Sequence, residues 1–75
     1  MNTAPYKQLA TNLKKIESAY KSIIDLTTEI EDDPKISLST RAYFIFNDLE
    51  IRKQRIMIKD KLAELSKIIG TDEGN

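Results

Sequence analysis

The sequence predicts an all-α protein in which two long helices fold back on each other as an antiparallel helical hairpin. Apolar residues recur at alternating spacings of three and four, which is the coiled-coil repeat of helices that pack together. The few helix-breaking residues of the chain stand at or near the ends of two long segments, at Pro5, Pro34, Gly70 and Gly74. A short polar stretch separates the segments, and a short connection favours antiparallel neighbours.

Length and composition restrict the class of protein. A chain of 75 residues makes one domain, 1–75, with a small core, and such domains commonly need a disulfide, a metal or a partner chain. The chain has no cysteine or histidine, which excludes disulfides and the common zinc sites. We therefore expect association with another chain, and we expect no cofactor or metal. The lack of cysteine fits a reducing cytosol, which predicts a cytoplasmic protein. No apolar run approaches the roughly 18 residues that span a bilayer, so we expect a soluble protein without a membrane span.

The first helix is predicted at about residues 4–31, capped by Asn2 or Thr3 and with Pro5 in its first turn. Flanking apolar residues widen its seam, which suits a bundle of three or four helices better than a two-stranded rod. The predicted seam consists of Tyr6, Leu9, Leu13, Ile16, Tyr20, Ile23, Thr27 and Ile30.

A turn is predicted at 32–38, because Pro34 cannot continue a helix. Ser37 or Ser39 can cap a second helix at about 39–69, and Gly70 is a natural left-handed cap at its end. The remaining residues, 70–75, are expected to form a frayed polar tail.

The second helix is apolar on two nearly opposite sides. One stripe contains Leu38, Ala42, Ile45, Phe46, Leu49 and Ile56. The other contains Phe44, Ile51, Ile58, Leu62, Leu65 and Ile69.

One hairpin partner covers only one of these sides, which leaves three alternatives. The second stripe can pair with another chain, the helix can break near Arg52–Arg55 to give a three-helix bundle, or both stripes can form one seam that drifts around the partner. We favour the first, in which two identical hairpins pair through the second stripe into a four-helix bundle. On this interpretation Ile16→Asp unfolds the chain, whereas Ile58→Asp first lowers its oligomeric state.

Two charged clusters are candidate contact sites. A basic flank on the second helix could follow the phosphates of a nucleic acid, although Asp48 lies four residues before Arg52 and favours an ordinary ion pair. An acidic cluster at the turn could contact a basic partner or a hard cation, although its spacing matches no calcium loop. The basic flank comprises Arg41, Arg52, Arg55 and Lys59, and the acidic cluster comprises Glu29, Glu31, Asp32 and Asp33.

The sequence contains no set of residues typical of a catalytic site, because nucleophilic catalysis needs a nucleophile, a base and an orienting group. We therefore expect a non-enzymatic protein–protein interaction or assembly module, such as a small regulator, inhibitor or adaptor. Two alternatives stay open. One is a Rop-like RNA-binding hairpin that uses the basic flank, although zero net charge provides no global field to attract a nucleic acid and argues against such binding. The other is a toxin-neutralising immunity protein that uses the acidic cluster.

Overall fold

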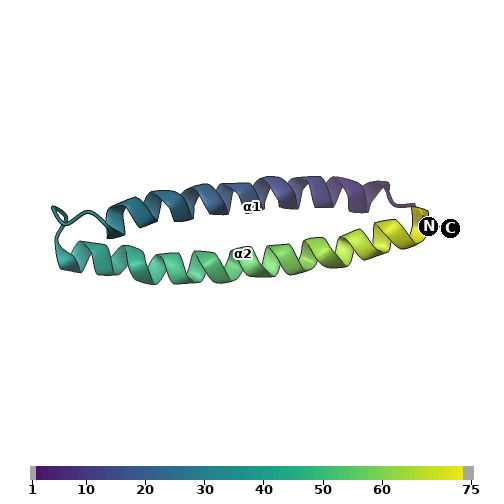
Figure 1. Cartoon of the computed structure of the whole chain (residues 1–75). Coiled ribbons are helices and arrows are strands. Elements are labelled where there is room, and N and C mark those ends of the chain that lie inside the picture. The colour runs from purple at the N-terminus through teal and green to yellow at the C-terminus, as the bar shows by residue number, and fades with distance from the viewer. Residues whose placement is uncertain (1, 74–75) are drawn as a thin grey trace.

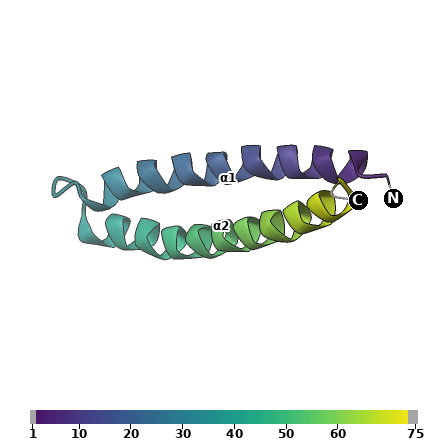
Figure 2. The ribbon, with the colours of Figure 1, turned by 45° about the vertical axis from the view of Figure 1, so that its right-hand side comes forward.

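The computed structural model describes residues 2–73 as two long helices packed side by side and joined by a short turn (Figure 1). Helix α1 spans Ala4–Glu31 and helix α2 spans Leu38–Glu73. Figure 2, turned from the first view, shows the helices side by side along their length, with the turn at one end of the rod. The molecule measures 57 × 15 × 14 Å along its principal axes. The predicted all-α helical hairpin is confirmed.

Local hydrogen bonds explain where α1 begins and ends. The Ala4 amide donates to Asn2 Oδ1 at 3.0 Å, so the Asn2 side chain occupies a donor that the first turn leaves free. Pro5 follows in the first turn, where its missing N–H costs nothing. At the other end the Asp32 amide still donates to the Thr28 carbonyl at 3.0 Å. The Asp33 amide donates instead to the Ile30 carbonyl at 3.3 Å, a tighter turn with which the helix ends.

Side chains of the turn start the second helix. Asp33 Oδ1 accepts a hydrogen bond from the Lys35 amide at 2.9 Å, which closes a tight turn around Pro34. The Thr40 amide donates to Ser37 Oγ at 3.3 Å, so Ser37 is the N-cap of α2.

Helix α2 is continuous, which excludes one of the three alternatives that the sequence left open. It passes Arg52–Arg55 without a break, so the three-helix bundle is wrong. It also runs beyond Gly70 to Glu73, so Gly70 lies inside the helix and not at its C-cap. No residue in the described range 2–73 has a positive φ. Of the predicted tail, residues 70–73 are helical, and 74 and 75 lie outside the described residues.

The residues between the helices form one regular repeat, here called the inner seam. All its members are buried or half-buried, and they follow one another at alternating spacings of three and four. On α1 the inner seam consists of Tyr6, Ala10, Leu13, Glu17, Tyr20, Ile24, Thr27 and Glu31. On α2 it consists of Phe44, Asp48, Ile51, Arg55, Ile58, Leu62, Leu65 and Ile69.

The predicted seam of the first helix is therefore only half right. Its other half consists of residues that flank the inner seam, and Leu9, Ile16 and Ile23 are 44%, 44% and 41% exposed. In the inner seam the neighbouring residues, such as Glu17 and Ile24, occupy the places predicted for these three. The predicted residues that do lie in the inner seam are Tyr6, Leu13, Tyr20 and Thr27.

The two stripes of α2 exchange the roles that the sequence suggested. The stripe from Phe44 to Ile69, expected to face another chain, packs against α1. The stripe expected to pack inside faces outward, with Leu38 73%, Leu49 54% and Ile56 60% exposed. The six residues predicted for self-association thus contribute to the packing within the hairpin.

The core between the helices is thin. Ile24 and Leu65, at 5% and 4% exposed, are the buried apolar residues of the described range. The accessible surface is 5586 Å², against roughly 4,700 Å² for a compact monomer of 8.6 kDa. The hairpin thus leaves apolar surface exposed that a more globular domain would bury.

Candidate interaction surfaces

A polar contact in the inner seam joins the helices near the turn. The Thr27 hydroxyl lies 3.2 Å from Asp48 Oδ1 and 2.9 Å from the Ile24 carbonyl oxygen. Arg52 Nε donates to the other carboxylate oxygen of Asp48 at 2.7 Å. The buried Asp48 carboxylate therefore has a partner on each helix, as a buried charge requires.

A second polar contact lies near the middle of the hairpin. Arg55 Nε donates to Glu17 Oε1 at 2.7 Å, and Lys59 Nζ lies 3.9 Å from the same oxygen. The Arg55 hydrogen bond is the main cause that lowers the pKa of Glu17, with smaller electrostatic contributions from Lys59 and Lys21. Glu17 therefore stays ionised and binds the two helices together.

Glu31 occupies the last inner-seam position of α1 without such compensation. Its Oε1 atom is buried and has no hydrogen-bond partner within the described part of the chain. Desolvation is the main cause that raises the pKa of Glu31, and the nearby Asp48 charge raises it further. Ionised Glu31 is thus less favourable in the folded hairpin than in a fully solvated chain.

The predicted basic flank lies along one edge of the hairpin, but its cations already have partners. Arg41 Nε donates to the Ile36 carbonyl at 3.0 Å. Arg52, Arg55 and Lys59 contact the carboxylates of Asp48 and Glu17 as described above. Nothing in this geometry favours the RNA-binding alternative.

The structure does not bring the predicted acidic cluster together as one site. Glu29 and Asp32 are exposed, whereas Glu31 turns into the inner seam and Asp33 closes the turn. Within residues 2–73 no group of three or more metal-ligating side chains comes together.

The outward side of α1 carries a second helical repeat, here called the neutral face. Its spacing again alternates between three and four, and Ile16, Ala19, Tyr20 and Ile23 line a shallow groove of about 270 Å³ on it. Sequence reasoning found most of these apolar residues but assigned them to the hairpin seam. The neutral face consists of Leu9, Asn12, Ile16, Ala19, Ile23, Leu26 and Ile30.

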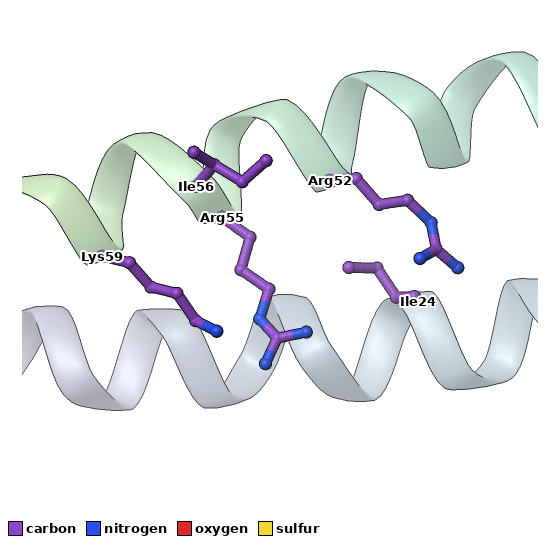
Figure 3. Close-up of a pocket in the computed structure, with 5 residues that line it drawn as sticks. All are labelled: Ile24, Arg52, Arg55, Ile56 and Lys59. Atoms are coloured by element: carbon purple, nitrogen blue, oxygen red, sulfur yellow. The ribbon is translucent and has the colours of Figure 1, made fainter.

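The outward side of α2 carries a comparable repeat in which basic residues replace some apolar ones, here called the basic-rimmed face. Beside it Ile24, Arg52, Arg55, Ile56 and Lys59 line a groove of about 220 Å³ (Figure 3). Figure 3 shows Ile24 reaching from α1 while Arg55 and Lys59 extend from α2 towards that helix. The basic-rimmed face consists of Leu38, Ala42, Ile45, Leu49, Arg52, Ile56 and Lys59.

The register places these two faces on opposite sides of the hairpin. In an antiparallel pair, residues that follow an inner-seam position on either helix share one side, and residues that precede one share the other side. Leu9 and Ile16 precede the inner-seam residues of α1. Leu49 and Ile56 follow those of α2. The molecule therefore has two separate apolar surfaces.

Within residues 2–73, neither helix combines the length and apolar character needed to cross a bilayer. Comparison of the chain with protein-family models, curated proteins and solved structures finds no match.

Proposed function

We propose that this protein is a non-enzymatic assembly module, a helical hairpin that pairs with a second copy of itself through the neutral face to form a four-helix bundle. The observation that carries the proposal is the second three-and-four repeat on α1, which is exposed although it has the spacing of a helix-packing seam. Exposed apolar patches of this extent mark interaction surfaces on small domains.

A twofold axis at Ala19 would make the neutral face complementary to itself. In antiparallel pairing about that point, Ile16 lies opposite Ile23 of the second copy, and Leu9 lies opposite Ile30. Ala19 then meets its own counterpart, where its small side chain lets the two helices approach closely. A closed twofold dimer uses the same surface on both chains, as this arrangement does.

Charge and area are both compatible with this pairing. Along the outer margin of the neutral face this pairing places Lys15 opposite Ser22 and Gln8 opposite Glu29 of the second copy, so these charged residues of α1 do not meet like charges. One whole side of the 57 by 14 Å rod, which includes the neutral face and the adjoining side of α2, has an area of about 800 Å², which is the usual contribution of one partner to a stable interface.

The test compares two aspartate variants with similar exposure and opposite location. Ile23→Asp, on the neutral face, should reduce a wild-type dimer to a monomer in sedimentation equilibrium, because the charge would lie buried between the copies. Leu49→Asp, on the basic-rimmed face, should leave the dimer intact. Both variants should keep their helical circular dichroism at high protein concentration. A wild type that stays monomeric at high micromolar concentration, or equal dissociation of both variants, would overturn the proposal.

The same geometry reverses the expectations for two other variants. Ile58→Asp puts a charge in the inner seam and should unfold the hairpin, whereas Ile16→Asp should dissociate the dimer while a helical monomer remains. Circular dichroism combined with sedimentation separates the two results.

A further inference from the structure

We propose that the basic-rimmed face of α2 binds an acidic amphipathic helix of a different protein, which would make the hairpin an adaptor with one face for its own copy and one for a partner. The inference goes beyond the pairing proposed above, because it concerns the opposite side of the molecule.

The apolar residues of this face have the spacing of a helix-packing surface, and a groove lies beside Ile56. Leu49 and Ile56 are 54% and 60% exposed and lie two turns apart on the same side of α2. Next to Ile56 the groove continues to Ile24, one of the buried core residues of the hairpin. Apolar residues spaced this way receive the i, i+3, i+4 and i+7 side chains of an amphipathic helix.

Beside this groove the bases are more exposed than the acids that they contact. Glu17 and Asp48 point into the hairpin, with side-chain exposures of 19% and 8%. Asp25, which follows an inner-seam residue, is an exposed acid on the same side and acts electrostatically on Arg52. Arg52 and Lys59 remain half-exposed beside these carboxylates, with side-chain exposures of 51% and 56%. A partner on this side therefore meets positive groups before it meets the carboxylates that they pair with.

Helix α1 adds positive charge to the same side. Lys14 and Lys21 each follow an inner-seam residue, so the register places them beside the basic-rimmed face. The electrostatic effect of Lys21 and Lys59 on Glu17 agrees with this placement. The groove is thus bordered by exposed cations from both helices.

These observations favour an acidic helix over a second copy. Twofold pairing of this face about its midpoint at Leu49 would place Arg52 against Ile45 and Lys59 against Leu38 of the second copy, so neither cation would meet a carboxylate there. A helix with glutamates beside its apolar stripe would instead place carboxylates next to the exposed cations. The apolar residues of such a helix would also fill the groove. A nucleic-acid backbone has no apolar groups to do so, which favours the helix as the partner.

The experiment uses three fluorescein-labelled synthetic helices of three heptads, each with leucine at the a and d positions. The flanking e and g positions carry glutamate in the first peptide, glutamine in the second and lysine in the third. Fluorescence anisotropy with the wild-type protein should show binding of the glutamate peptide at least about tenfold tighter than of the glutamine peptide, and the difference should shrink with added salt.

Charge reversal on the protein provides the decisive comparison. Lys21→Glu/Lys59→Glu should weaken binding of the glutamate peptide by about tenfold or more and strengthen binding of the lysine peptide. The matched control, Lys15→Glu/Lys67→Glu, makes the same change of charge at exposed positions away from this face and should leave both affinities unchanged. Ile56→Asp should abolish binding of the glutamate peptide while the chain stays helical.

Failure of this proposal is distinguishable from failure of the dimer. Ile23→Asp should still bind the glutamate peptide, because its substitution lies on the opposite face. Equal affinity for the glutamate and glutamine peptides would overturn the proposal, as would equal effects of the two charge-reversal variants. The proposal would also be overturned if phosphatidylserine vesicles or mixed RNA bound this face more tightly than the glutamate peptide does. In a competition experiment they would then displace the labelled peptide, and its anisotropy would fall.

Discussion

Thr27 and Asp48 face each other across the hairpin, with the Thr27 hydroxyl 3.2 Å from Asp48 Oδ1. The two residues lie on different helices, 21 positions apart in the sequence, so any shift of one helix along the other breaks the contact. A slip of one heptad would place the buried carboxylate opposite Tyr20 or Pro34. We infer that this polar pair helps to select the register of the hairpin, as single polar residues do in coiled coils.

Replacing the buried carboxylate should therefore destabilise the hairpin. Asp48→Ala removes the contact with Thr27 and the partner of Arg52, and hydrogen bonds to charged groups contribute about 1.5–3 kcal/mol each. We expect a loss of that order in urea denaturation at one fixed protein concentration. Asp60→Ala, an exposed position on the same helix, is the control and should change stability by less than about 0.5 kcal/mol. Equal effects of the two variants would contradict a role for the buried pair.

Leu65 should contribute most of the apolar stability at the open end of the hairpin. It is 4% exposed, so Leu65→Ala leaves a cavity and should cost about 2–5 kcal/mol. Leu49, at 54% exposed, is the matched control, and Leu49→Ala should cost much less because its side chain stays largely in water. Urea denaturation of both variants tests the orientation of α2, since rotation of the helix by half a turn would reverse the order.

Glu31 should make the hairpin less stable as the pH rises. Its folded pKa lies above the ordinary value of 4.5, so the folded state binds the proton more tightly than the unfolded chain. The favourable contribution is complete below the unfolded pKa and is lost as the pH rises through the folded pKa. Glu31→Gln should therefore raise the melting temperature at pH 7 and have little effect in acid.

Glu17 provides a control of opposite sign. Its pKa is lowered by Arg55, so its contribution is present above the unfolded pKa and disappears as the pH falls through the folded value. Glu17→Gln should lower the melting temperature at pH 7. If both variants shift it in the same direction, the two carboxylates do not have the environments described here.

The hairpin itself could be predicted from the sequence because its signals are local. Pro34 and the serine cap at Ser37 define the turn, and the regular spacing of apolar residues defines both helices. The facing sides could not be predicted, because apolar character alone favours Ile16 and Ile23 over Glu17 in the inner seam. Glu17 lies inside because Arg55 on the other helix compensates its charge, and the pattern of one helix does not reveal that compensation.

The candidate surfaces show the same limit. The apolar residues of both faces stand out in the sequence, but which of them are exposed depends on a rotation of each helix about its axis. Arg55 illustrates this, because it reads as part of a basic edge in the sequence and lies half-buried against Glu17 in the structure. The cations that stay exposed, such as Lys59, could be separated from it only after the register was known.

Substitution of Gly70 distinguishes the sequence prediction, in which this residue caps the second helix, from the structure, in which it lies within α2. The two predict changes in stability of opposite sign. A glycine at a left-handed helix cap resists substitution, because a Cβ atom is strained at positive φ. In the structure Gly70 lies within α2, has no positive φ, and no atom lies within 4 Å of the position a Cβ would take. Gly70→Ala should then stabilise the helix by about 0.5–1 kcal/mol, because alanine loses less conformational freedom than glycine in a helix. Thermal melting followed by circular dichroism should show a higher midpoint for Gly70→Ala than for the wild type. A lower midpoint would mean that α2 ends at Gly70 in solution.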